Sequence, residues 1–170
     1  MVSIAAVRKA ALRPTLPPVL DGVSLRVAAG ETFGLCGPGA GGKSLLLKIL
    51  CGLVHPEEGR VEIDGVDMHD RARAADHLRV RAAIGMLFQN NALFDHLTVN
   101  ENIAFPLRRL YALPEEEVRS RVEERLSCVA LAGFGTRMPG GLSGGQKKRV
   151  GVARATITNA PIVLYDEPAA

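Results

Sequence analysis

The chain has 170 residues, of which 47% are hydrophobic and 23% are charged, and its formal net charge is +3. This is the composition of an ordinary globular domain and excludes an intrinsically disordered chain. The arginines are scattered through predicted helices, so we expect a solvated surface and no nucleic-acid partner. No uncharged apolar run approaches the roughly 18 residues needed to cross a bilayer. We therefore expect membrane association only through partners.

Short apolar strands and a helix alternate in the first part of the chain. Residues 23–27 alternate apolar and polar side chains, which predicts a strand, and Gly30 marks the turn after it. Residues 32–36 form an apolar run that predicts a second strand leading into a glycine-rich loop. Residues 44–53 are mostly apolar around Lys48 and predict a helix that is buried on most sides.

Three further strands are predicted along the chain. Residues 59–65 predict an edge-like strand with an Asp64-Gly65 turn. Residues 83–88 predict an apolar strand that delivers Gln89. A last strand is predicted over residues 162–167.

A helical pattern begins at Thr98. Residues 115–131 place four apolar side chains on one stripe, and the same helix carries i,i+4 pairs of Glu and Arg on its solvated face. Ser143 begins another helix, which extends through Ala155. The stripe consists of Val118, Val122, Leu126 and Val129, and the charge pairs are Glu115 with Arg119 and Glu117 with Arg121.

A glycine-rich loop fits the pattern G-x-x-x-x-G-K-[ST]. Glycines let the main chain approach a dense anion closely, and a helix N-terminus supplies backbone N–H donors. We expect Lys43 to reach the β- and γ-phosphates and Ser44 to offer its hydroxyl to Mg²⁺. The residues expected to bind ATP here are Gly37, Pro38, Gly39, Ala40, Gly41, Gly42, Lys43, Ser44 and Leu45.

Two carboxylates lie at the end of the last predicted strand. A buried carboxylate at Asp166 is costly without a cation, so we expect it to bind Mg²⁺ together with Ser44 and Gln89. Glu167 leaves the strand on the opposite face. Gln89 can donate or accept a hydrogen bond without carrying charge, which suits a residue that contacts water, Mg²⁺ and the γ-phosphate. We expect Lys43 and Gln89 to be catalytic residues.

The pentapeptide 142–146, Leu-Ser-Gly-Gly-Gln, lies between the glycine-rich loop and the carboxylates. It predicts a second anion-binding helix N-terminus. A lone G-x-x-x-x-G-K-S recurs by chance, whereas the ordered set of loop, Gln89, pentapeptide and Asp166-Glu167 is specific. With this set, the chain from Val19 to Pro168 resembles the nucleotide-binding subunits of ABC transporters.

The resemblance implies the α/β fold of a P-loop NTPase ABC cassette. Such a cassette has a mainly parallel core sheet, an N-terminal antiparallel β region and a helical subdomain. We expect a single domain over residues 1–170, incomplete at its C-terminus. The core would comprise residues 1–94 and 156–170, and the helical subdomain with its signature helix would comprise residues 95–155.

The resemblance also implies how the residues act. Glu167 would orient and polarise the attacking water. Ser143, Gly144, Gly145 and Gln146 would bind the nucleotide held by a second cassette, so that two cassettes sandwich two ATP molecules. Such a dimer works on a membrane permease, which places the chain peripherally at the cytoplasmic face of the inner membrane.

Four segments are similar to the cassettes of Mla-type phospholipid transport systems, which are related to those that serve Mce proteins. They predict ATP-driven phospholipid transport at the bacterial inner membrane, with an Mce-type lipid-binding subunit as a further partner. Substrate choice lies in other subunits, so an ABC importer or exporter ATPase for another substrate is the alternative. The segments are 42–48, 87–95, 100–107 and 146–151.

Two alternatives lie outside transport. A DNA-repair or chromosome-organising ATPase inserts long heptad coiled coils, whereas the roughly 100 residues between Lys43 and Ser143 carry no sustained heptads. A translation-type cassette pairs two copies in one chain. The family continues past Ala170 to a histidine that faces the γ-phosphate, so we expect a fragment or a natural truncation. A non-catalytic nucleotide-binding module is then the other alternative, which a turnover assay separates from an enzyme.

Several positions depart from the family pattern or lie outside it. Ala40 stands where cassettes usually have glycine, which predicts strain if that position needs positive φ. Residues 12–16 lack the aromatic side chain that many cassettes stack on adenine. Cys36, Cys51 and Cys128 show no C-x-x-C spacing and are expected to be buried small hydrophobes. The four histidines lack ligand spacing and are expected to be surface or loop residues.

Overall fold

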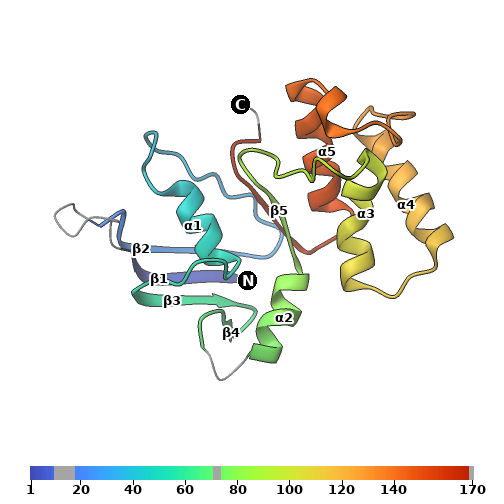
Figure 1. Ribbon diagram of the computed structural model, residues 1–170. Coiled ribbons are helices and arrows are strands. Elements are labelled where there is room, and N and C mark those ends of the chain that lie inside the picture. Colours follow the sequence, from blue (N-terminus) through green and yellow to red (C-terminus); the bar gives the residue numbers. More distant parts are fainter. Residues whose placement is uncertain (10–17, 71–73, 169–170) are drawn as a thin grey trace. The chain divides into compact units, whose positions relative to one another are not determined.

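The computed structural model describes residues 1–9, 18–70 and 74–168, and these form two compact units, Met1–Arg81 and Ala82–Ala170 (Figure 1). Unit 1 contains the elements β1 (Val2–Lys9), β2 (Leu20–Val27), α1 (Lys43–Leu50), β3 (Glu58–Ile63) and β4 (Val66–Asp67), and α2 (Ala74–Ala82) ends at the boundary. Unit 2 contains β5 (Ile84–Leu87), α3 (Val99–Leu110), α4 (Glu115–Cys128), α5 (Gly144–Thr156) and β6 (Ile162–Tyr165).

Unit 1 is built on a four-stranded antiparallel sheet with the order β2-β1-β3-β4. Central strand β1 pairs Val2 with Val27 of β2 and with Ile63 of β3. This sheet confirms the predicted N-terminal antiparallel β region. The buried side chains of the sheet and of α1 form the core of the unit; they include Val7, Leu20, Leu46, Ile49, Leu50, Val61, Ile63, Val66 and Met68.

The Asp64-Gly65 turn joins β3 to β4 as the sequence predicts. Both residues adopt positive φ, at 48° for Asp64 and 79° for Gly65. Two consecutive residues in this region give a hairpin turn whose twist matches that of the flanking strands. Asp and Gly are the residues that tolerate it at low cost, which is why this dipeptide predicted the turn.

Helix α1 is shorter than the predicted helix over residues 44–53. It ends at Leu50, because Gly52 adopts a left-handed φ of 70°, with the Gly52 N–H donating to the Ile49 carbonyl and the Leu53 N–H to the Lys48 carbonyl. Leu46, Ile49 and Leu50 are buried while Lys48 is exposed. The apolar face of the helix is therefore directed into unit 1, and its other face meets solvent.

Residues 32–36 do not form the predicted strand. They belong to no ladder in the described parts of unit 1, and Phe33 and Leu35 are 47% and 37% exposed. A strand requires hydrogen bonds from a neighbouring backbone, and an apolar run cannot supply these by itself. The predicted parallel pairing occurs instead between β5 and β6 in unit 2, with Leu87 opposite Tyr165.

The helices of unit 2 confirm the predicted helical subdomain. Helices α3, α4 and α5 share one hydrophobic core, and the predicted stripe on α4 contributes to it. Val129, the last member of that stripe, lies just past the end of α4 and is partly buried. The buried members are Val99, Ile103, Ala104, Leu107, Val118, Val122, Leu126, Leu131, Leu142, Val150, Ala153 and Ile157.

Of the two Glu–Arg ion pairs predicted for the charged face of α4, one is present and the other is replaced. Glu117 forms the expected ion pair with Arg121. Glu115 forms its ion pair with Arg108 of α3, although Arg119 had been expected as its partner. A helix neighbour is a weak partner for an exposed carboxylate, and a nearby guanidinium on another helix can displace it.

The environments of the cysteines correct a second prediction. Cys51 is buried, and burial raises the pKa of its thiol above the ordinary value. Cys36 and Cys128 are exposed, contrary to expectation. Cys36 lies in the segment that does not form a strand, and Cys128 is the last residue of α4 on its solvated side, so neither enters the core.

Within the part of the chain that the structure describes, none of the helices has both the length and the apolar character that crossing a bilayer requires. The prediction about an adenine-stacking residue concerns residues 12–16, which lie outside the described residues.

Asn102 of α3 is an unpredicted organising residue. Its side chain is fully buried, accepts a hydrogen bond from the Phe94 N–H, and donates to the carbonyls of Phe94, Leu97 and Thr98. It thus satisfies the backbone of the loop between β5 and α3, and this is the loop that follows Gln89.

We expect Asn102→Ala to lower the free energy of unfolding by about 2–3 kcal/mol, because it leaves buried backbone groups without hydrogen-bond partners. Urea unfolding measures the change. Asn100→Ala is the matched control on the same helix, since the Asn100 Oδ1 atom is already buried without a hydrogen-bond partner. Equal losses in the two variants would contradict the role of Asn102.

Candidate functional site

The glycine-rich loop of unit 1 leads directly into α1. Gly42 is the N-cap of the helix with φ 82°, and a Cβ atom there would lie 2.8 Å from the Leu20 side chain. Glycine is therefore required at this position for both conformation and space. No side chain caps the helix, and its first turn carries no acidic residue. The N-terminal backbone donors and the positive end of the helix dipole are thus available to an anion.

Lys43, the first residue of α1, folds back over the loop. Its ammonium group donates to the carbonyl oxygens of Gly37 at 3.0 Å and Pro38 at 2.7 Å. The Gly41 N–H also donates to the Pro38 carbonyl, at 3.2 Å. These bonds close the loop into a ring with one cation at the helix N-terminus. This arrangement of charge and donors is suited to a phosphate group.

Ala40 occupies the strained position that the sequence indicated. Its φ is 58°, in the left-handed region where a Cβ atom costs about 1–2 kcal/mol. Gly41 and Gly42 follow it in the loop. The strain is stored in the segment that would contact phosphate, so a ligand that fixes this loop would also hold the unfavourable conformation.

The predicted catalytic residues of unit 2 come together at the carboxyl ends of β5 and β6. Gln89 follows β5, and its amide Nε2 donates to the Glu167 Oε2 at 2.9 Å. Asp166 is 5% exposed, and its backbone N–H donates to the Leu87 carbonyl at 3.0 Å, which continues the ladder past Tyr165. Glu167 is exposed, so the two adjacent carboxylates differ in burial as expected for side chains that leave a strand on opposite faces.

Two basic residues of α5 support this edge and were not predicted. Lys148 donates from its ammonium group to the Glu167 backbone carbonyl at 2.9 Å, and Glu167 has a left-handed φ of 53°. Arg154 is 9% exposed and donates to the Asn91 and Ala92 carbonyls at 2.6 and 2.8 Å. One helix therefore anchors both loops that carry Gln89 and Glu167.

The sequence places Arg154 between two alanines, but this signal does not identify its partners. Arg154 is a charged residue within the buried part of α5, beside Ala153 and Ala155. Burial lowers the pKa of Arg154 from its ordinary value. Asn91 and Ala92, whose carbonyls accept these hydrogen bonds, have left-handed φ angles of 58° and 48°. The hydrogen bonds compensate for the desolvation of the guanidinium group and stabilise a strained turn.

The pentapeptide forms the N-terminus of α5. Ser143 is the N-cap: its hydroxyl accepts from the Gln146 N–H at 3.3 Å, and the Gln146 Oε1 accepts from the Ser143 N–H at 2.9 Å. This is a complete capping box. Gly144 and Gly145 lie in the first turn with open space around them. The helix N-terminus is thus held rigid and remains accessible.

The chain is similar to a protein family and to individual known proteins. The ABC transporter family model matches residues 20–170. The chain is 42% identical to the probable ribonucleotide transport ATP-binding protein mkl of Mycobacterium bovis, over 88% of this chain and 42% of that protein. It is 45% identical to the methionine import ATP-binding protein MetN of Carboxydothermus hydrogenoformans, over 88% of this chain and 44% of that protein.

The solved structures agree with these sequence relationships. A dimeric post-hydrolysis state of the ATP-binding cassette MJ0796 bound to ADP and Pi matches with a TM-score of 0.92 and 36% identity, over 99% of this chain and 75% of that chain. The α/β fold of a P-loop NTPase ABC cassette, expected from the sequence, is confirmed. The chain belongs to the ABC transporter family. It spans less than half the length of the curated relatives named above.

We expect Ser143→Ala to lower the free energy of unfolding by about 1 kcal/mol, since it removes the N-cap of α5. Ser143→Thr keeps the cap and should retain most of the stability. Ser127→Ala is a control, because the Ser127 hydroxyl donates only to the Glu123 carbonyl within α4 and is exposed. Thermal unfolding of the three variants tests the cap, and a loss for Ser143→Ala no larger than that for Ser127→Ala would contradict it.

Proposed function

We propose that this chain is the ATP-binding and ATP-hydrolysing subunit of an ABC transporter. The observation that carries the proposal is the glycine-rich loop closed by Lys43 at the uncapped N-terminus of α1. Such a loop offers backbone donors, a helix dipole and one cation to a polyphosphate. Membership of the ABC transporter family agrees with this chemistry.

The backbone and the side chains of the loop have separate roles in binding ATP. The backbone of residues 37–42 and Leu45 surrounds the phosphates, and Lys43 moves from its two carbonyls to the β- and γ-phosphates. Ser44, Gln89 and Asp166 would hold Mg²⁺, whose charge would offset the negative charge of the phosphates. Asp166 is 5% exposed, and its carboxylate oxygens are ligands of the kind that Mg²⁺ prefers.

Glu167 polarises the water that attacks the γ-phosphate. Its Oε2 is held by the Gln89 amide at 2.9 Å and its backbone by Lys148, so the carboxylate is oriented before substrate arrives. A carboxylate that receives one amide hydrogen bond still has acceptor capacity for the proton of water. Positioning of this kind supplies a large share of catalysis in phosphoryl transfer.

The signature residues act on a second copy of the cassette. Ser143, Gly144, Gly145 and Gln146 present an open helix N-terminus, which suits the phosphates of the nucleotide that a partner cassette binds through its own loop. The dimeric state of the MJ0796 cassette supports an assembly of two cassettes around two nucleotides. ATP would hold the dimer together, and hydrolysis would release it.

We also propose one cassette domain over residues 1–170, with core segments 1–94 and 156–170 and a helical subdomain over 95–155. The shared core of α3, α4 and α5 supports the extent of the helical part. The chain would work peripherally at the cytoplasmic face of the inner membrane, through a permease that carries the membrane-spanning segments.

Phospholipid is the substrate that we propose, on the strength of the four segments similar to Mla-type cassettes. An Mce-type lipid-binding subunit would be the additional partner. The names of three relatives refer to the transport of ribonucleotide, methionine and sulfate or thiosulfate, and these substrates belong to those proteins. Because such different substrates are served by similar cassettes, import of another small substrate is the second candidate.

Lys43→Ala tests the phosphate role. We expect it to abolish ATP binding measured by calorimetry, because it removes the one loop cation that faces the phosphates. Lys48→Ala is the matched control on the same helix, since Lys48 is exposed at the other end of α1. Equal ATP affinities in wild type and Lys43→Ala would refute the assignment.

The substrate class is tested by purification of the full-length protein from its source membranes. We expect it to co-purify with a permease and an Mce-type subunit, and mass spectrometry should detect bound phospholipid. Lys43→Ala serves as the control for a cassette that cannot cycle. Recovery of an amino-acid or peptide permease would overturn the lipid assignment and leave the ATPase proposal intact.

A further inference from the structure

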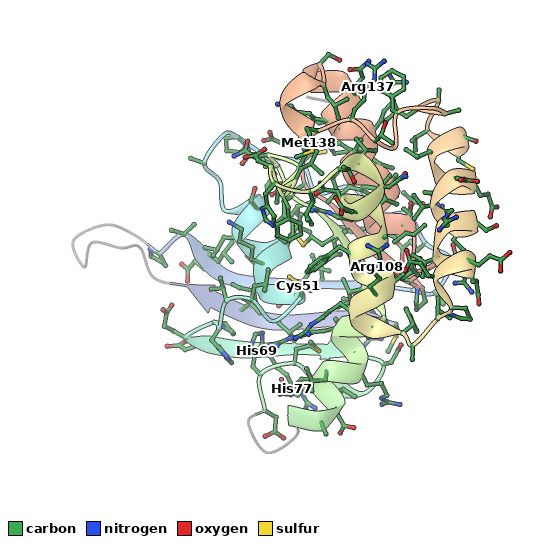
Figure 2. The ribbon with its side chains drawn as sticks, turned by 45° about the vertical axis from the view of Figure 1, so that its right-hand side comes forward. Cys51, His69, His77, Arg108, Arg137 and Met138 are labelled. Atoms are coloured by element: carbon green, nitrogen blue, oxygen red, sulfur yellow. The ribbon has the colours of Figure 1, made fainter. Side chains whose placement is uncertain are left out.

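Two histidines from separate segments of unit 1 meet beside the C-terminal end of α1. His55 lies in the loop after Gly52, and His69 lies just after β4. Their Nδ1 atoms are 3.1 Å apart, and their rings are nearly edge to face, with centroids 4.8 Å apart. Figure 2 labels His69. This pair could not be predicted from the sequence, because fourteen positions separate the two residues.

The hydrogen bonds of His69 fix which of its nitrogens faces His55. The His69 Nε2 lies 3.1 Å from the Ile49 carbonyl oxygen, which can only accept, so Nε2 carries the proton. In the neutral ring, Nδ1 therefore presents a lone pair to His55. The backbone N–H of His69 donates to the Asp67 Oδ1 at 3.0 Å, which holds the residue in place. A histidine whose other nitrogen donates to a backbone carbonyl is typical of an oriented metal ligand.

The surroundings favour the neutral ring and a nearby cation. Burial lowers the pKa of His69, and the charge of His55 lowers it further, so the lone pair is available near neutral pH. Ile49 contributes one of the last carbonyls of α1, at the negative end of the helix dipole. The charged groups near this end include Asp67, whose carboxylate also pairs with Arg60 at 3.3 Å, and Arg81, whose guanidinium donates to the Gly52 carbonyl.

The separation of the two nitrogens matches that of two ligands on one ion. With metal–nitrogen distances of about 2.0–2.1 Å, two ligating nitrogens lie about 2.9–3.4 Å apart for angles between 90° and 110°. The observed 3.1 Å falls within this range. Among the described residues there is no group of three or more His, Cys, Asp and Glu side chains that could hold a metal. The site would therefore have two protein ligands, with water completing the shell.

We propose that His55 and His69 form a two-imidazole binding site for a divalent transition-metal ion such as Zn²⁺, Ni²⁺ or Cu²⁺, the ions that imidazole ligands suit. The ion binds to both Nδ1 atoms and replaces the proton that one of them would otherwise share with the other. It cross-links the loop after α1 to the segment after β4. The site lies at the opposite end of α1 from Lys43 and is independent of nucleotide chemistry.

Calorimetric titration of the full chain with Ni²⁺ alone tests this site. The background carries Cys36→Ser and Cys128→Ser, because these exposed thiols would compete for the metal. We expect one ion per chain, and His55→Ala or His69→Ala should weaken binding at least about tenfold, since two linked ligands bind far more tightly than one. Ni²⁺ should also raise the unfolding temperature in this background and in neither of these variants.

His77→Ala and His96→Ala are the matched controls. His77 contacts the Asp67 carbonyl through its Nε2 and has no part in the pair, and His96 belongs to unit 2. Both controls should keep the affinity of the background protein. If His69→Ala fails to fold, His55→Ala decides, because His55 is exposed. The proposal would be overturned if His55→Ala bound Ni²⁺ as tightly as the background protein, or if His96→Ala alone lost affinity for Ni²⁺. Either result would show that the pair is only an imidazole–imidazole hydrogen bond.

Discussion

Because β5 and β6 pair in parallel with Leu87 opposite Tyr165, the segments that follow them leave the sheet at one edge. Gln89 and Glu167 come within hydrogen-bond distance for this reason, although 78 positions separate them in the chain. The Asp166 N–H extends the same ladder to Leu87, so the buried carboxylate is fixed by main-chain geometry. Strand pairing, more than any side-chain contact, thus determines where the proposed chemistry of unit 2 takes place.

Helix α5 packs so closely on this pair of strands that glycine is needed on both sides. A Cβ atom on Gly85 would lie 2.0 Å from the Ala155 carbonyl oxygen, and one on Gly151 would lie 2.7 Å from the Leu87 side chain. This close approach allows Lys148 and Arg154 to reach the loops after β6 and β5. The helix that begins at the signature serine therefore also supports the proposed catalytic edge, which offers a physical route for coupling between them.

The sequence was informative where a local rule decides the structure. The Asp64-Gly65 turn, the start of a helix at Ser143 and the stripe on α4 each follow from interactions within a few residues. Residues 32–36 were predicted wrongly, because a strand also needs a partner backbone. The contacts of Lys148, Arg154 and the His55–His69 pair could not be predicted, since each joins segments that only the tertiary fold brings together.

The most direct test of the proposed ATPase is phosphate release by Glu167→Gln, measured beside wild type and Glu124→Gln in the full-length protein with ATP and Mg²⁺. Glu124 is an exposed residue of α4 and provides the matched control. The Glu167 variant keeps the shape and the hydrogen bond to Gln89 but loses the carboxylate that polarises water. We expect its rate to fall at least about 100-fold, with an ATP-bound dimer accumulating in size-exclusion chromatography, while the control stays at the wild-type rate. Phosphate release at the wild-type rate by Glu167→Gln would contradict the proposed mechanism.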